Sequence, residues 1–121
     1  MKNNKLQVAV IGCGGIANQK HFPALKSQAD KCEMVAFCDI LIERAEKAAK
    51  EYGSADAKVY QDYNELLKDE NIDVVHICTP NVSHSPIAVA AFESKKHVLC
   101  EKPMAATTED AQKMMDAWKK S

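Results

Sequence analysis

Residues 6–17 read LQVAVIGCGGIA, an apolar run followed by a glycine-rich loop. The loop matches G-x-G-x-x-G/A, which marks a dinucleotide-binding turn when it follows a strand and opens a helix. Gly12 permits a tight turn, Gly14 lets a pyrophosphate approach the backbone, and Ala17 lets the helix pack closely on the strand. The helix start would present backbone N–H groups to the phosphates, although a glycine-rich turn without a ligand is the alternative. The predicted dinucleotide-binding residues of the loop are Gly12, Gly14, Gly15, Ile16 and Ala17.

Short apolar runs alternate with helical patterns along the rest of the chain. Continuous apolar runs suit strands that are buried on both faces of a parallel sheet. The predicted strands are residues 6–11, 34–38, 58–60, 74–78 and 97–100. Strands that alternate with helices imply right-handed crossovers. We therefore predict an α/β protein with a doubly wound, mostly parallel sheet, a Rossmann fold of five strands in the order 3-2-1-4-5. A flavodoxin-like order is the alternative.

Local signals place several helix boundaries. Pro23 should break the first helix, because it lacks a backbone donor and clashes with the preceding turn. A helix over residues 42–52 should stop at Gly53. Asp62 followed by Glu65 is a capping-box pattern at the start of another helix.

Two further helices are predicted in the second half of the chain. Ser85 and Pro86 suggest an N-cap and a first-turn proline. The last helix should open at Thr107, with an apolar stripe that packs on the core. The stripe comprises Ala111, Met114, Met115 and Trp118.

Composition indicates an ordinary globular domain and excludes several classes. The 121 residues are 46% apolar and 27% charged, which is typical of one folded domain. The formal charge is −1, from 16 basic and 17 acidic residues, and Arg44 is the single arginine, so nucleic acid is not expected as a partner. No apolar run approaches the roughly 20 residues of a membrane span, nor is there a secretory signal pattern.

The five cysteines predict reduced thiols. Their number is odd and none forms a C-x-x-C pair, so we expect neither a disulfide framework nor a metal site. They are Cys13, Cys32, Cys38, Cys78 and Cys100. Reduced thiols predict a cytoplasmic location.

Asp39 closes the second predicted strand, about 20 residues beyond the glycine loop. A carboxylate at this place accepts hydrogen bonds from the adenosine ribose and repels a 2′-phosphate, which favours NAD over NADP. The alternative role is an N-cap for the following helix, and Asp39 could serve both roles. Arg44 could reach back to a phosphate, but we expect it on the solvated face of its helix.

Two polar segments follow the fourth and fifth strands, where open α/β sheets bind ligands. The first segment is Thr79-Pro80-Asn81-Val82-Ser83-His84, and the second is Glu101-Lys102-Pro103. Their positions alone make them either site residues or ordinary turn residues.

The sequence resembles the Gfo/Idh/MocA family of oxidoreductases, which includes glucose–fructose oxidoreductase and inositol dehydrogenase. The matching segments are residues 10–17, 21–25, 73–84 and 96–104, in the family's order, with Glu-Lys-Pro as the most specific. The resemblance implies a hydride transfer between a nicotinamide cofactor and a CH–OH group of a sugar, inositol or related polyol.

The resemblance also implies roles for individual residues. Lys102 would lie beside the nicotinamide and hydrogen-bond the substrate oxygen, as the catalytic residue. Glu101 would lie near the nicotinamide ribose. The implied contacts along the cofactor are Thr79, Pro80, Asn81 and His84, and for His84 a purely structural role at the helix start is an equal alternative. We interpret the other three histidines, His21, His76 and His97, as structural.

Family members continue beyond a domain of this size. The resemblance implies that residues 1–121 are the dinucleotide-binding domain and that the C-terminal substrate domain, which also forms the homo-oligomer, is absent. Because hydride transfer needs both reactants held together, we expect this chain to bind cofactor without turnover. A stand-alone dinucleotide sensor is the alternative function. A methyltransferase would share the glycine loop, but the Glu-Lys-Pro and Thr-Pro-Asn segments argue against it.

Overall fold

A computed structural model describes residues 2, 4–15, 17–79, 81–100 and 108–120. At residues 81–85, 100, 108 and 110 it describes the backbone alone. The strands are β1 (Leu6–Ile11), β2 (Cys32–Cys38), β3 (Lys58–Tyr60), β4 (Val74–Ile77) and β5 (His97–Cys100). The helices are η1 (Ala17–His21), α1 (Phe22–Ser27), α2 (Ile42–Tyr52), α3 (Tyr63–Leu66), α4 (Asn81–Glu93) and α5 (Thr108–Lys120).

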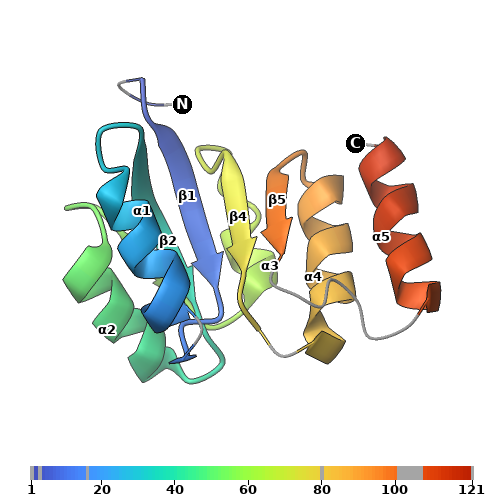
Figure 1. The fold of residues 1–121 in the computed structure, drawn as a ribbon, viewed down its shortest axis with the longest axis horizontal. Helices are drawn as coiled ribbons and strands as arrows, with labels where there is room; N and C mark the ends of the chain where they lie inside the picture. Colours follow the sequence, from blue (N-terminus) through green and yellow to red (C-terminus); the bar gives the residue numbers. More distant parts are fainter. Residues whose placement is uncertain (1, 3, 16, 80, 101–107, 121) are drawn as a thin grey trace.

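The five strands form one sheet in the order β3-β2-β1-β4-β5, and all neighbouring pairs are parallel. This confirms the predicted Rossmann order and shows that the flavodoxin-like alternative is wrong. The carboxyl ends of the strands lie along the lower edge of the sheet in Figure 1. Five of the six residues of β1 are buried, because the strand is central and both of its faces are covered.

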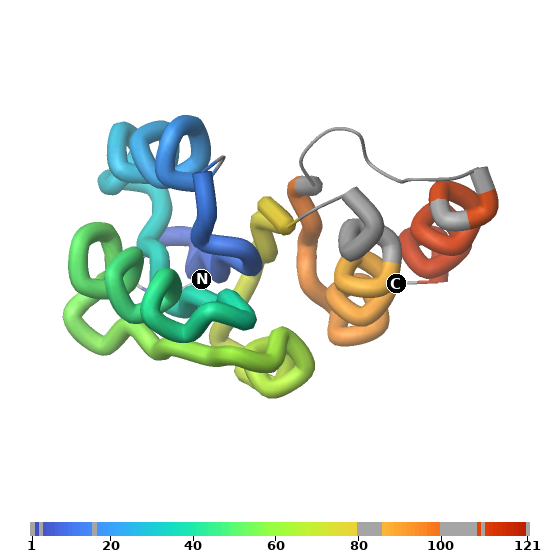
Figure 2. The backbone as a smooth tube through the Cα atoms, turned by 90° about the horizontal axis from the view of Figure 1, so that it is seen from below, coloured from blue at the N-terminus to red at the C-terminus, as the bar shows by residue number. Residues whose placement is uncertain are grey.

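Side chains alternate along β1 between two cores. Val8 and Val10 pack with Phe22 of α1 and Ala45 of α2. Ala9 and Ile11 belong to the second core, to which α3, α4 and α5 contribute. In both views α4 and α5 run side by side, away from α1 and α2 (Figures 1 and 2). The two cores therefore cover opposite faces of the sheet.

Several predicted boundaries hold. The strands β1, β3 and β5 have the predicted bounds, β2 begins two residues early, and β4 ends at Ile77. The break predicted near Pro23 is not seen: η1 ends at His21, α1 begins at Phe22, and the backbone of His21 is helical, so the helix changes from π to α with Pro23 in the first turn of α1. Gly53 does end α2, but with an extended backbone at φ −74° rather than a left-handed one. A glycine is needed there because a Cβ would lie 2.5 Å from the carbonyl oxygen of Ala49.

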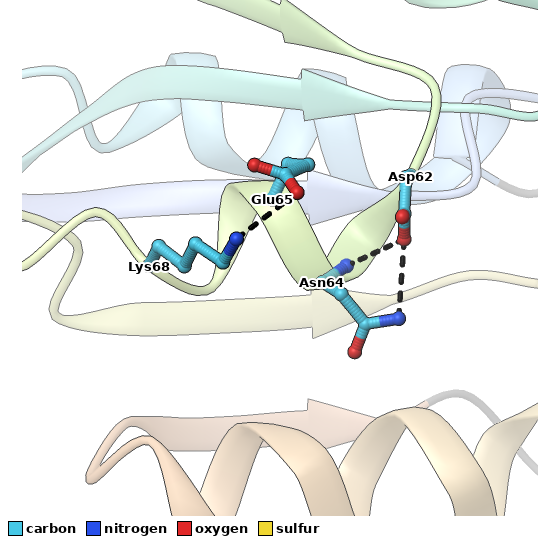
Figure 3. A network of polar contacts seen from close by, with 4 residues as sticks. All are labelled: Asp62, Asn64, Glu65 and Lys68. Carbon is cyan, nitrogen blue, oxygen red and sulfur yellow. Dashed lines mark hydrogen bonds and ion pairs between the residues drawn. The ribbon is translucent and has the colours of Figure 1, made fainter.

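The cap of α3 differs from the predicted capping box in one contact. Asp62 is the N-cap, and its Oδ1 accepts a hydrogen bond from the backbone N–H of Asn64 at 2.9 Å. Glu65 does not complete the box; its carboxylate pairs with Lys68 at 3.1 Å (Figure 3). The helix is a single turn, so the two charged side chains lie close along the exposed surface.

Two predictions about α4 and α5 are wrong. Helix α4 begins at Asn81, so Pro86 lies inside the helix and not in its first turn. A proline removes only its own N–H, and the preceding turn still forms through other residues. In α5, Met114 and Ala117 are buried, whereas Met115 is 41% and Trp118 is 56% exposed. The packed stripe is thus rotated by one residue from the predicted one.

Within the described part of the chain, no helix is both long and apolar enough to cross a membrane.

Candidate functional site

The glycine loop packs directly against the end of β4. Gly12 has φ +93°, and a Cβ on it would lie 2.8 Å from both the carbonyl carbon of Cys78 and the nitrogen of Thr79. Its own N–H donates to the carbonyl oxygen of Cys38 at 2.7 Å. Only glycine fits this turn, because both the backbone conformation and the space exclude a side chain.

The rest of the loop opens toward solvent. A Cβ on Gly15 would meet nothing within 4 Å, and one on Gly14 would lie 3.3 Å from Nη1 of Arg44. Ala17 is fully buried beneath the first helical turn, as expected for the small residue between helix and strand. The backbone of the loop is therefore accessible from the side on which Arg44 lies.

Asp39 joins the glycine loop to the start of α2. Its Oδ2 accepts a hydrogen bond from the backbone N–H of Cys13, and its Oδ1 accepts one from Leu41, both at 2.9 Å. The side chain is 8% exposed. The N-cap of α2 is Leu41, so Asp39 is not the N-cap that we considered as its alternative role. A carboxylate offers about four acceptor positions, so two remain for a ligand.

A crevice of about 710 Å³ runs along the carboxyl ends of β1, β2 and β4. It brings together residues that the sequence analysis selected separately, namely Gly12, Gly14, Gly15, Asp39 and Thr79. Among the lining residues that were not predicted are Ile40, Leu41, Gln61, Tyr63 and Pro86. Gln61 could have been found from sequence, because it directly follows β3 at the same edge of the sheet.

Arg44 is placed differently from our expectation. It is exposed, but it lines the crevice, and it also lines a smaller hollow of about 260 Å³ between the glycine loop and α2. Lys47 lines that hollow too. Two cations thus lie beside the glycine loop: Arg44, which is exposed as expected but takes the position that we considered as its alternative, and Lys47. Arg44 lies in the first turn of α2, and its Nη1 comes within 3.3 Å of the position that a Cβ on Gly14 would take.

Some selected residues lie outside what the structure describes. Ile16, Pro80, Glu101 and Lys102 are not described, and for Asn81 and His84 the description extends only to their backbone in α4. The crevice is therefore defined by the loop, Asp39 and Thr79.

Three buried thiols lie near the glycine loop, and a fourth lies at the start of β2. They are Cys13, Cys38 and Cys78 near the loop and Cys32 in β2. Burial, helped by the nearby Asp39 carboxylate, raises the pKa of Cys13 and of Cys38 to about 12. Both thiols therefore stay protonated at neutral pH and are weak nucleophiles. No group of three or more histidine, cysteine or acidic side chains within the described residues could hold a metal ion.

Two of the histidines form a pair away from the crevice lining. The Nδ1 atoms of His21 and His76 are 3.1 Å apart, and the rings meet edge to face. Burial, together with the neighbouring His21, lowers the pKa of His76 to about 4. The pair links the first helical segment to β4. His97 is exposed on β5.

A model of the Gfo/Idh/MocA oxidoreductase family, NAD-binding Rossmann fold, matches residues 6–121. The chain belongs to this family. It is 38% identical over 116 residues to inositol 2-dehydrogenase of Salmonella typhimurium, covering 96% of this chain and 34% of that enzyme. It is also 38% identical over 120 residues to D-glucoside 3-dehydrogenase of Escherichia coli, covering 99% and 33%. The chain therefore spans about a third of the length of the curated relatives that it matches.

Solved structures share the Gfo/Idh/MocA Rossmann fold. The WlbA dehydrogenase from Bordetella pertussis, in complex with NADH and UDP-GlcNAcA, has a TM-score of 0.88 and 28% identity, covering 96% of this chain and 35% of that one. The 3-ketoreductase KijD10 from Actinomadura kijaniata, in complex with NADP and TDP-benzene, has a TM-score of 0.87 and 28% identity, covering 97% and 35%. The chain is thus an NAD(P)-binding Rossmann domain of this oxidoreductase family, whose solved relatives bind either cofactor.

Proposed function

We propose that the chain binds NAD along the crevice, as the cofactor-binding part of an oxidoreductase that acts on a CH–OH group of a sugar, inositol or related polyol. The observation that carries this proposal is the hydrogen bond from the Cys13 N–H to the Asp39 carboxylate at 2.9 Å. It places the acidic residue against the glycine loop, so a ribose site and a pyrophosphate site adjoin. This is the arrangement that a dinucleotide requires.

The residues that line the crevice fit such a ligand. Gly14 and Gly15 leave the loop backbone open to a pyrophosphate, and Arg44 adds a cation beside it. The remaining acceptor positions of Asp39 would hold the ribose hydroxyls. Ile40 and Leu41, both exposed on the same wall, would offer apolar surface to the base.

The cofactor preference depends on two opposing charges. Asp39 repels a 2′-phosphate on the neighbouring ribose, whereas Arg44 would attract one. Of the two charged groups, Asp39 would lie closer to the 2′ position, because its carboxylate would contact the ribose hydroxyls themselves. We therefore propose NAD as the cofactor, with Arg44 serving the pyrophosphate.

Family resemblance supplies the catalytic proposal. NAD, when bound, accepts a hydride from the substrate carbon. Lys102, in the Glu-Lys-Pro segment, would hydrogen-bond the substrate oxygen and stabilise negative charge that develops there. Glu101 would lie near the nicotinamide ribose, and Thr79, Pro80, Asn81 and His84 would follow the cofactor. We propose that residues 1–121 form one dinucleotide-binding domain, that a further substrate domain completes the active site, and that this chain alone does not turn over.

Calorimetric titration of the chain with NAD, NADP and S-adenosylmethionine tests the proposal. We expect saturable binding of NAD, weaker binding of NADP and none of S-adenosylmethionine. The proposal is wrong if neither nicotinamide dinucleotide binds, or if S-adenosylmethionine binds more tightly than both.

A further inference from the structure

The proposed dinucleotide contacts do not distinguish one nucleotide from another. ADP, IDP and UDP share the ribose and the diphosphate, which are the parts that Asp39 and the glycine loop would hold. Selection of an adenine cofactor must therefore come from groups that face the base. Because the base is attached to the ribose, these groups lie in the part of the crevice next to Asp39.

Gln61 is a polar side chain in that part of the crevice. It follows β3, lines the crevice together with Asp39 and Ile40, and is exposed. Its Nε2 donates a hydrogen bond to the backbone carbonyl oxygen of Ile40 at 2.8 Å. A carbonyl oxygen only accepts hydrogen bonds, so this contact determines which way the amide is turned. The remaining acceptor, Oε1, is held in a defined orientation on a residue that lines the crevice.

The other lining side chains near Asp39 are poorly suited to reading the base, and the Tyr63 hydroxyl, which both donates and accepts, does not distinguish a 6-amino from a 6-oxo group. Ile40 and Leu41 are apolar, and contact any base equally. Arg44 only donates hydrogen bonds, so it would favour a 6-oxo group over a 6-amino group. Each Asp39 oxygen already accepts a backbone hydrogen bond and faces the ribose in the proposed complex.

We infer that Gln61 selects a 6-aminopurine over a 6-oxopurine in the crevice, an inference that rests on the proposed binding of NAD. Its Oε1 accepts a hydrogen bond from the exocyclic amino group, the pairing by which glutamine amides read adenine elsewhere. A 6-oxo group would place two acceptors against each other. Turning the amide over would relieve this clash but would break the hydrogen bond to Ile40.

Calorimetric titration of the chain with ADP and with IDP tests the inference. These ligands differ only at the base, so their affinity ratio isolates its recognition. We expect the unmodified chain to bind ADP about fivefold more tightly than IDP, as one net hydrogen bond allows. In Gln61→Leu the ratio should fall to about one, through weaker ADP binding. Gln112→Leu is the matched control, because Gln112 is an exposed glutamine on α5 that bonds Asp116 and lies outside the crevice lining.

The outcomes separate the inference from the proposed function. If ADP and IDP bind the unmodified chain equally, or if Gln61→Leu keeps the preference, the inference is wrong while NAD binding stands. If neither diphosphate nor NAD binds, the proposed function fails and the inference fails with it. The comparison of ligands on the unmodified chain needs no variant, so a folding defect in Gln61→Leu does not block the test.

Discussion

Around β1 and β2 the chain is held by contacts that leave no room for an added atom, whereas α4 and α5 are held mainly by buried apolar side chains. A Cβ at Gly12 would overlap the backbone at the end of β4, and one at Gly53 would overlap Ala49 of α2 and the side chain of Ala57. In contrast, α4 and α5 meet the core through Ile87, Ala91 and Met114. A substitution at a sterically tight position or at a buried hydrogen bond is costly even when it is small. In an apolar core, the loss of stability grows with the amount of side chain removed. Most of the crevice lining comes from the region that tolerates less change, and α4 adds Pro86 and Ile87.

The largest effect is expected at the glycine turn. Gly12→Ala should lower the free energy of unfolding by about 4 kcal/mol, because the new Cβ overlaps the end of β4 and the positive φ is strained. Gly15→Ala is the matched control and should change the stability by less than about 1 kcal/mol, since its Cβ would meet open space. Urea unfolding of both variants measures the difference, and equal stabilities would contradict the steric account.

Asp39 provides the next largest effect. Asp39→Ala leaves two backbone N–H groups without their acceptor and should lower the free energy of unfolding by about 3 kcal/mol. Because the glycine loop loses its support, the affinity for NAD should fall at least about tenfold, and that for NADP should not rise. Asp62→Ala, which removes an exposed N-cap, is the control at about 1 kcal/mol. A variant that gains NADP affinity at unchanged stability would show that Asp39 acts only by repulsion.

In the α4–α5 half we expect smaller losses. Met114→Ala removes a buried side chain and should lower the free energy of unfolding by about 2 kcal/mol. Met115→Ala, one position further along α5, should stay within about 0.5 kcal/mol, because that side chain is 41% exposed. Neither change should alter the affinity for NAD. Chemical unfolding combined with calorimetry measures both, and a loss of NAD binding in Met114→Ala would show that the two halves are coupled.

The last expected effect is a pH dependence that comes from His76 of β4, which contacts His21 of η1. The pKa of His76 falls from 6.5 to about 4 on folding, so the unfolded chain binds more protons between these values. The contribution of this histidine to the free energy of unfolding should therefore be fully present above pH 6.5. It should fall as the pH decreases toward 4, by at most about 1.4 kcal/mol per pH unit. His76→Gln should reduce this slope, and the exposed His97→Gln should not. Urea unfolding at pH 7 and pH 5 measures the slope; an unchanged slope in His76→Gln would assign it to other groups.

The sequence predicted the sheet well because its signals are local. Buried parallel strands are apolar on both faces, as the run at 6–11 is, whereas the run at 58–60 is a weaker signal because β3 lies at the edge of the sheet and Lys58 is exposed. The start of α4 was missed, because a Ser-Pro pair is a local signal that a helix begun at Asn81 overrides. The predicted buried face of α5 is displaced by one residue from the observed one. The periodicity of apolar residues gives their spacing along the helix but does not show which side of the helix packs against α4.

The amino-acid sequence alone determined the alternation of strands and helices, the glycine loop and the acidic residue after β2. Each depends on the conformation of a few neighbouring residues. Only the tertiary structure decided that Asp39 holds Cys13, that Arg44 lies beside Gly14, and that Gln61 is turned by Ile40. These contacts join segments that are distant in the chain, so they depend on strand register and helix placement, which no local pattern encodes.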